Sequence, residues 1–249
     1  MKKVLILGSK PGARIIDGDY IYCANAAISD YASEIKYYSH IVNVVSGGVL
    51  DMRKIAEDYP KKEYFTKKWH AIIDSKPDRL LITKPYDYEK LKKRLLSLGY
   101  TAPIEMISAL QRRLIVKQIS GHEDPIFSWE FLSLSPELQY LYIKYYRRNK
   151  RRRKREYEFD CDGVFRPSTG VIAALIAVRD HGHKAEYIIS GVGITNRGTY
   201  VDRQFMHSGK LHAHIFPDGK VLKTLAKRYS FFTTEPELTR YLPYYGSQK

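Results

Sequence analysis

Cysteine is scarce in this chain of 249 residues, which contains only Cys23 and Cys161. The two do not form a closely spaced pair, so we expect reduced thiols and a cytoplasmic location rather than a disulfide framework. Long apolar runs are also missing. Residues 4–7 (VLIL) are followed at once by Gly8-Ser9-Lys10, so they predict neither a secretory signal nor one of the roughly 18-residue apolar segments that cross membranes.

Motifs for several common cofactors are absent as well. Gly8 and Gly12 do not have the G-x-G-x-x-G spacing of a dinucleotide-binding loop, and the sequence contains no P-loop. Cysteines and histidines do not cluster with the spacing of a zinc site. Two Asp-x-Asp strings could hold a divalent cation against a diphosphate. Asp17-Gly18-Asp19 favours a turn, because Asp-Gly is a strong turn signal, whereas Asp160-Cys161-Asp162 stays open as a metal site.

Hydrophobic residues make up 44% of the chain, which predicts a globular protein with a core. Short apolar runs typical of buried strands occur at residues 4–7, 20–23, 41–45, 72–73, 80–82 and 187–190. Helical spacing is found at residues 50–57, 88–98, 171–178 and 221–225. The alternation predicts a single α/β domain over residues 1–249 with a mainly parallel sheet. Ligands bind at the carboxyl ends of strands in such folds, which here are Gly8-Ser9, Asn25, residues 43–48 and residues 191–196.

Residues from about 120 to 160 lack this alternation. Ser135-Pro136-Glu137 is a typical helix start, and Leu138, Leu141, Tyr142 and Tyr145 follow it at helical spacing. Eight of the nine residues at 147–155 are basic, and removing them lowers the formal net charge from +15 to 15 − 8 = +7. We interpret this region as a helical insertion that carries a basic cluster.

The segment Arg166-Pro167-Ser168-Thr169-Gly170 stands directly before an apolar, alanine-rich helical pattern. Ser168 or Thr169 can cap the helix, and Gly170 lets another backbone approach closely. The free N–H groups and the dipole of such a helix start suit an anion such as phosphate. By itself the pattern more often serves only to satisfy the helix end.

The sequence around this segment, from residue 166 to residue 193, carries a longer pattern. Residues 166–174, a helix, and then Ile188-Ile189-Ser190-Gly191-Val192-Gly193 closely resemble the small sialyl motif of sialyltransferases. They also look like the corresponding segment of bacterial sialyltransferases of glycosyltransferase family 42. The resemblance implies a Rossmann-like variant of the GT-A fold, and it implies that Ser168, Thr169 and Gly170 contact the CMP part of a CMP-sugar donor.

A second resemblance lies near the N-terminus. Four pieces occur here in the same order as in the large motif of that family. They are residues 4–9, Ile16-Asp17, residues 19–21 and Asn25. This resemblance implies that Gly8, Ser9 and Asn25 line the nucleotide and donor site, and Asn43 is similar to a further donor-site asparagine. Ser9 stands where bacterial members often have asparagine, and Cys23 stands where an arginine is usual.

Transfer of a sugar to a hydroxyl needs a base, and a histidine near its ordinary pKa suits this role at neutral pH. The position of His214 before the last helical pattern is similar to that of the family's catalytic histidine, with His212 as the next candidate and His207 as the third. Tyr200 lies where the family has a tyrosine that stabilises the leaving phosphate. The second such tyrosine is missing here, and Arg197 or Arg203 could compensate.

These resemblances predict an inverting glycosyltransferase that moves sialic acid or a related acidic sugar from a CMP-sugar to a glycan or glycolipid acceptor. They imply a bacterial enzyme of lipooligosaccharide or capsule synthesis that needs no metal or other cofactor. Two alternatives stay open. One is a metal-dependent transferase that uses a UDP- or GDP-sugar, and the other is a non-enzymatic basic protein that binds membrane or nucleic acid.

The basic cluster has three interpretations. It is a solvated surface loop or, equally favoured, a patch that binds an anionic membrane, and nucleic-acid binding is less favoured. Membrane-anchored glycolipid acceptors in the resembled family support the membrane interpretation, with peripheral binding to the inner membrane. The predicted membrane-binding residues are Arg147, Arg148, Lys150, Arg151, Arg152 and Arg153. The insertion would then act as a lid, an acceptor-binding segment or a membrane-binding segment.

Overall fold

The structure is a computed structural model that describes most of the chain. The described residues are 1–10, 12–35, 37–83, 87–122, 131–132, 135–137, 139–140, 143–144, 147, 167–193 and 215–246.

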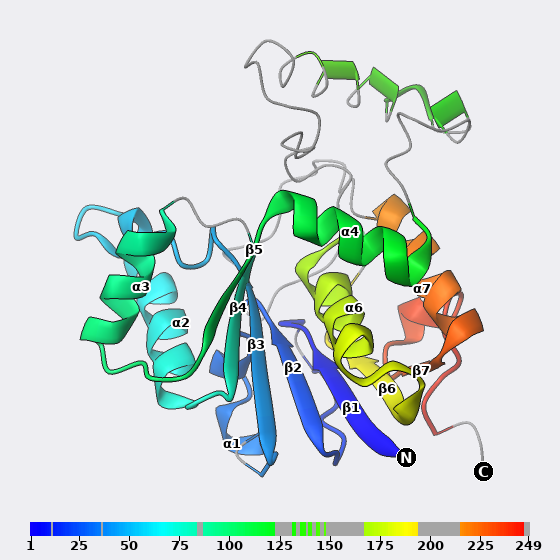
Figure 1. Ribbon diagram of the computed structural model, residues 1–249, viewed down its shortest axis with the longest axis horizontal. Helices are drawn as coiled ribbons and strands as arrows, with labels where there is room; N and C mark the ends of the chain where they lie inside the picture. Colours follow the sequence, from blue (N-terminus) through cyan, green and yellow to red (C-terminus); the bar gives the residue numbers. More distant parts are fainter. Residues whose placement is uncertain are drawn as a thin grey trace.

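A seven-stranded sheet forms the centre of the described fold, and every pair of neighbouring strands in it is parallel (Figure 1). The strand order is β5-β4-β3-β2-β1-β6-β7. The strands are β1 (Lys2–Leu7), β2 (Tyr20–Ala24), β3 (His40–Ser46), β4 (Arg79–Thr83), β5 (Ile104–Ile107), β6 (Ala185–Ser190) and β7 (Ser230–Thr233). The predicted α/β class with a mainly parallel, Rossmann-like sheet is therefore confirmed.

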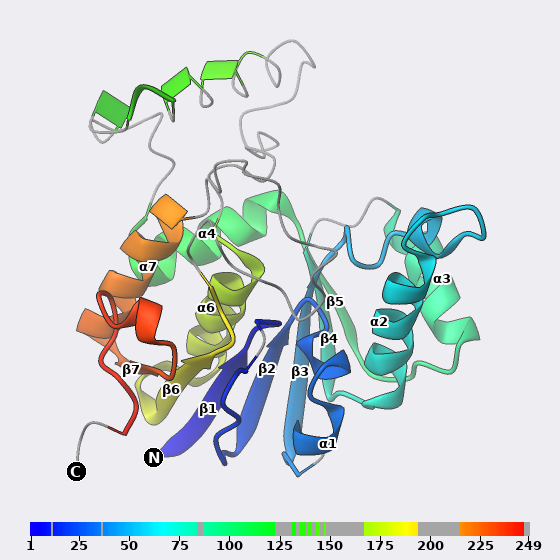
Figure 2. The ribbon, with the colours of Figure 1, turned by 180° about the vertical axis from the view of Figure 1, so that it is seen from behind.

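Helices cover both faces of the sheet (Figures 1 and 2). One core cluster joins the sheet to α4 (Ala109–Ser120), α6 (Thr169–His181) and α7 (Ile215–Arg228). The opposite cluster joins it to α1 (Ala32–Ile35), α2 (Lys62–Asp74) and α3 (Tyr88–Ser97). Short 3-10 turns complete the described elements: η1 (Ala27–Ser29), η2 (Met52–Ile55), η6 (Gly182–Lys184) and η8 (Pro236–Leu238).

The chain changes direction across the sheet at β1. From β1 it builds outward through β2, β3, β4 and β5, and later strands β6 and β7 add on the other side of β1. Connections from β1 and β6 therefore leave in opposite directions, and in open parallel sheets a crevice for ligands forms at this switch point, beyond the carboxyl ends of the strands. In Figure 1 these ends are at the top, where α4, α6 and α7 also begin.

Several element predictions need correction. Residues 72–73, predicted as a strand, belong to α2, whose buried residues Phe65, Trp69 and Ile72 follow helical spacing. The helix expected at 50–57 is only the short turn η2. The sequence patterns also did not predict β5, α4 and β7.

The predicted insertion lies largely outside the described residues. Within it, residues 136–137, 139–140, 143–144 and 147 are helical. No described helix is both long enough and apolar enough to cross a bilayer.

Candidate functional site

The loops after β1 and β6 approach each other so closely that only glycine fits. The Gly8 amide donates to the Ser190 carbonyl at 2.8 Å, and the Lys10 amide donates to the Gly191 carbonyl at 2.9 Å. A Cβ atom on Gly8 would lie 2.1 Å from the Gly191 oxygen, and Gly191 itself has a φ of +67°. The two predicted loops thus form one structure at the switch point.

The first turn of α6 packs on the same loop. A Cβ atom on Gly170 would lie 2.8 and 2.9 Å from the two methyl groups of Val192. Gly170 is therefore needed for the helix start to approach the loop after β6. Through these contacts the fold brings the predicted residues Gly8 and Ser9 to the same edge as residues 168–170.

Two amides at the start of α6 have no acceptor among the described residues. Ser168 caps the helix, since its Oγ accepts from the Val171 amide at 3.4 Å and its carbonyl accepts from the Ile172 amide at 2.9 Å. The amides of Thr169 and Gly170 come between these and make no hydrogen bond within the described chain. Unsatisfied amides and the positive end of the helix dipole together favour an anion here.

Asp218, in the first turn of α7, holds Ser168 in place. Its Oδ1 accepts from the Ser168 amide at 2.7 Å, and its side chain is buried, with 1% of the residue exposed. Its Oδ2 has no partner among the described residues. Burial raises the pKa of Asp218 to about 7, although the hydrogen bonds from Ser168 lower it. The starts of α6 and α7 are therefore joined by a carboxyl group that changes charge near neutral pH.

Lys10 connects the loop after β1 to the turn after β7. Its Nζ lies 2.8 Å from Glu235 Oε2 and 3.1 Å from Glu237 Oε1, and Glu235 Oε1 accepts from the Gly191 amide at 2.7 Å. Burial lowers the pKa of Lys10, but the hydrogen bonds and charges of the two glutamates outweigh it, so the net direction is upward. Lys10 thus stays charged, and the carboxylates offset its charge.

Asn25 lies at the end of β2 in a left-handed conformation, with a φ of +52°. Its amide donates to the Val44 carbonyl at 2.8 Å, and its Oδ1 accepts from the Ser46 amide at 3.0 Å. The side-chain Nδ2 has no partner among the described residues, so it remains as a donor beside the carboxyl edge.

The turn that follows Asn25 is held by a buried lysine of α2. Lys68, 2% exposed, donates to the Ala26 carbonyl at 3.4 Å, to Ser29 Oγ at 3.0 Å and to an Asp30 carboxylate oxygen at 3.3 Å. A buried lysine is tolerated when it is paired in this way, and the pairing fixes the position of the loop after β2.

Asn43 does not join the other predicted residues. It lies inside β3 between Cys23 and Leu80 of the neighbouring strands, three residues before the strand ends, and it is fully buried. Neither atom of its side-chain amide has a partner among the described residues.

Asp17-Gly18-Asp19 lies at the amino end of β2, at the opposite edge of the sheet. Asp19 forms two hydrogen bonds with Lys3, since its amide donates to the Lys3 carbonyl at 3.0 Å and its side-chain carboxylate accepts from the Lys3 amide at 2.8 Å. Asp17-Gly18-Asp19 therefore holds the amino ends of β1 and β2 together. The described part of the chain contains no group of three or more His, Cys, Asp or Glu side chains placed to hold a metal ion.

Several predicted residues lie outside the described residues. These are His207, His212, His214, Tyr200, Arg166, Asp160, Asp162, Arg148, Lys150, Arg151, Arg152 and Arg153. Of the predicted membrane-binding residues, Arg147 is described, and it is exposed.

The sequence patterns did not identify Asp218, Lys10, Glu235 or Glu237 as parts of this edge. An acid in the first turn of a helix, as at Asp218, was the only local signal, and it is too common to indicate a site. Glu235 and Glu237 follow β7, which the patterns also did not predict. No protein-family model matches the chain, and neither a curated protein nor a solved structure matches it.

Proposed function

We propose that this protein is an inverting glycosyltransferase that uses a CMP-sugar donor, with sialic acid or a related acidic sugar as the transferred group. The observation that carries the proposal is the pair of acceptor-free amides at Thr169 and Gly170, placed at the switch point of a parallel sheet. The resemblance of residues 166–193 to sialyl motifs supplies the identity of the nucleotide. The acceptor is a glycan or glycolipid, and the enzyme acts in the cytoplasm, where it binds the inner membrane peripherally.

In this proposal the phosphate of the donor binds at the start of α6. The amides of Thr169 and Gly170 donate to its oxygens, and the helix dipole stabilises the negative charge that grows on the phosphate as the sugar leaves. Ser9 and the Nδ2 of Asn25 lie along the same edge and bind the remainder of the donor.

The acceptor hydroxyl attacks the anomeric carbon as the bond between that carbon and the CMP oxygen breaks. The hydroxyl proton passes to a base, for which the sequence predicts His214, with His212 as the next candidate. CMP then leaves as the anion, stabilised by the α6 amides and, by resemblance, by Tyr200.

Calorimetric titration with CMP and UDP tests the donor class. We expect CMP to bind with at least about tenfold higher affinity than UDP, which corresponds to about 1.4 kcal/mol. The absence of measurable CMP binding to the folded protein would contradict the proposal.

Thr169→Pro tests the anion site directly. Proline is well tolerated at the first position of a helix, so this change removes one donating amide with little effect on the fold. Because a hydrogen bond to a charged group contributes about 1.5–3 kcal/mol, we expect CMP affinity to fall by roughly 10- to 100-fold.

The matched control is Thr169→Ala, which keeps the amide and removes only the hydroxyl. Both variants are compared with the parent protein by calorimetry and by thermal unfolding. Equal CMP affinity in Thr169→Pro and the parent protein would exclude the start of α6 as the phosphate site.

A further inference from the structure

Two leucines of α4 are exposed on the surface of the molecule. Leu110 is 41% exposed and Leu114 is 44% exposed, and Lys117 follows on the same side of the helix. The opposite side of α4 packs into the core through Ile115 and Val116. Leu110, Leu114 and Lys117, which we name the α4 stripe, are therefore an apolar surface that ends in a cation.

The surroundings of the α4 stripe are strongly basic. Helix α4 has no acidic residue and carries Arg113 and Lys117 at its surface, whereas its third basic residue, Arg112, is buried. Helix α7 has four basic residues and one acid, the buried Asp218. The two helices pack together, and the Arg228 guanidinium of α7 donates to the Ile119 carbonyl of α4 at 2.9 Å. The charge of this part of the surface complements an anionic partner.

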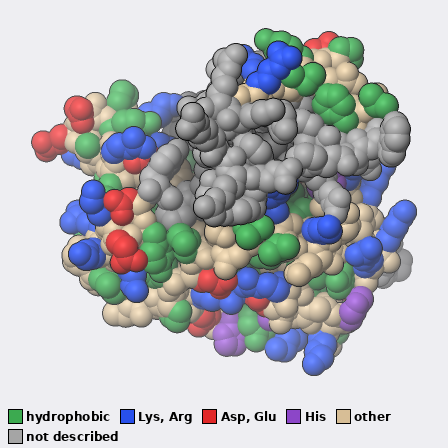
Figure 3. Space-filling view, turned by 45° about the horizontal axis from the view of Figure 1, so that its top comes forward, with side chains coloured by type: hydrophobic (Ala, Val, Ile, Leu, Met, Phe, Trp, Pro, Cys, Tyr) green, Lys and Arg blue, Asp and Glu red, His purple; other side chains and the backbone are tan. Residues whose placement is uncertain are grey.

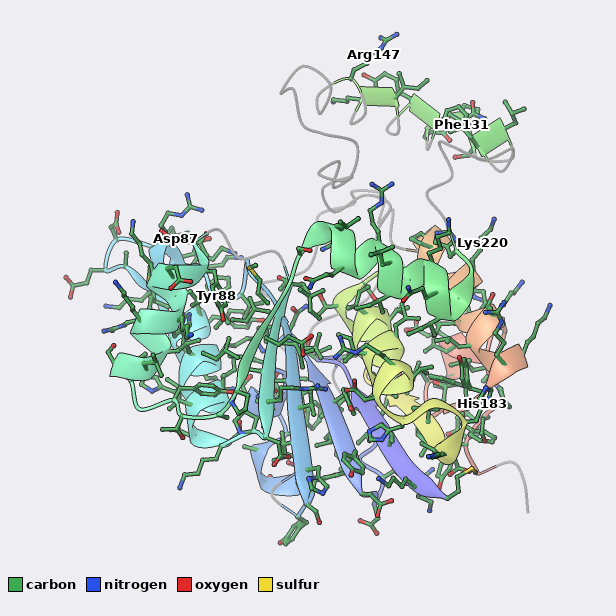
Figure 4. The ribbon with its side chains drawn as sticks, viewed as in Figure 1. Asp87, Tyr88, Phe131, Arg147, His183 and Lys220 are labelled. Carbon is green, nitrogen blue, oxygen red and sulfur yellow. The ribbon has the colours of Figure 1, made fainter. Side chains whose placement is uncertain are left out.

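A second exposed stripe repeats the pattern. Tyr140, Ile143, Lys144 and Arg147 occur at positions i, i+3, i+4 and i+7, and all four are exposed. Tyr140 is 63% exposed and Ile143 is 39% exposed. Figure 4 shows Phe131 and Arg147 beyond the carboxyl ends of the strands, and it shows Lys220 on α7 at the side of the molecule. Figure 3 turns this end forward and shows exposed hydrophobic side chains beside lysine and arginine.

We propose that the α4 stripe, together with the exposed residues Tyr140, Ile143, Lys144 and Arg147, docks on an anionic lipid bilayer. Exposed leucines, isoleucine and tyrosine insert at the level of the headgroups, and the neighbouring cations interact with anionic lipids. The carboxyl edge of the sheet, where α6 begins, would then lie close to the bilayer. An acceptor anchored in the membrane could reach the site without leaving the lipid.

The leucines favour a bilayer over nucleic acid as the partner. Basic residues alone would fit either polyanion, because both are bound through charge. Leu110 and Leu114 offer no hydrogen bond or stacking surface to a nucleic acid, whereas a bilayer buries them favourably.

Sedimentation with vesicles tests the proposal on the full chain. We expect binding to phosphatidylcholine vesicles that contain one third phosphatidylglycerol, and little binding to pure phosphatidylcholine. Leu110→Ser combined with Leu114→Ser should lower the partition coefficient by about tenfold. Lys117→Glu should lower it by roughly tenfold as well.

Leu96→Ser and Lys92→Glu on α3 are the matched controls, since Leu96 is 53% exposed and Lys92 is exposed on a helix of the opposite face. Equal vesicle binding by the α4 variants and these controls would overturn the proposal. So would a drop in the melting temperature of the α4 double variant that far exceeds twice the drop caused by Leu96→Ser, because it would mean that the two leucines pack within the chain. If the protein bound duplex DNA more tightly than vesicles, and if the leucine changes left that DNA binding unaltered, the surface would be a nucleic-acid surface instead.

This inference rests on the proposed function, because it assigns the peripheral membrane binding of that proposal to a particular surface. CMP binding measured on the same variants should match that of the parent protein, so failure of membrane docking and failure of the donor site give different results.

Discussion

Replacing Gly8 by alanine should disrupt both the stability and the ligand binding of this protein. The added Cβ atom would lie 2.1 Å from the Gly191 oxygen, a backbone atom that cannot move aside without shifting the loop after β6. Such an overlap in a packed region costs about 3 kcal/mol, and we expect the free energy of unfolding to fall by at least about that amount. Urea unfolding monitored by circular dichroism measures the change.

The same change should weaken CMP binding, because the displaced loop carries Val192, against which the start of α6 packs. Gly48→Ala is the control, since its Cβ atom would meet its nearest neighbour at an ordinary 3.6 Å and its φ is not positive. The control should change stability by less than about 1 kcal/mol. If Gly8→Ala were as stable as the control, the close approach of the two loops would be wrong.

Replacing Asp218 by asparagine should stabilise the protein at pH 8 and have little effect at pH 4. The asparagine side chain keeps an oxygen that can accept from the Ser168 amide but carries no charge. The gain at pH 8 is at most about 4 kcal/mol, given by the difference between a folded pKa of about 7 and the ordinary value of 3.8. The dipoles of α6 and α7 favour the charged carboxylate, so the observed gain should be smaller.

Proton linkage determines how the stability of the folded protein changes with pH. The folded-state pKa of Asp218 is raised, so between about pH 4 and pH 7 the folded protein binds a proton that the unfolded chain has released. The contribution of Asp218 to the free energy of unfolding is therefore greatest below about pH 4, and it is lost as the pH rises through 7. Asparagine cannot ionise, so its advantage over the parent protein grows across this interval and is constant above it.

Urea unfolding of the parent protein and Asp218→Asn at a series of pH values measures this difference. Asp218→Ala is the second variant, and it should be less stable than Asp218→Asn at every pH because it leaves the Ser168 amide without its acceptor. A stability difference between Asp218→Asn and the parent protein that does not vary with pH would show that Asp218 keeps an ordinary pKa in the folded state.

Much of the fold could be predicted from the sequence because its signals are local. The apolar run at residues 4–7 and the alanine-rich pattern at 171–178 became β1 and α6, since burial on all sides leaves few alternatives for such runs. The prediction of a strand at Ile72-Ile73 was wrong because two adjacent β-branched residues favour a strand when they are considered alone. The helical spacing of Phe65, Trp69 and Ile72 extends over a longer window and was the stronger signal.

The sequence by itself determined the α/β class and the capped start of α6, including Ser168, Thr169 and Gly170. Only the tertiary structure decided which residues meet there. The Gly8 loop reaches Gly191, and Asp218 reaches Ser168 across 50 positions of the chain. Caps and strand ends depend on neighbouring residues and so can be recognised locally. Contacts between distant segments, and the burial of Asn43 inside β3, depend on how the strands are ordered in the sheet, which the apolar pattern alone does not specify.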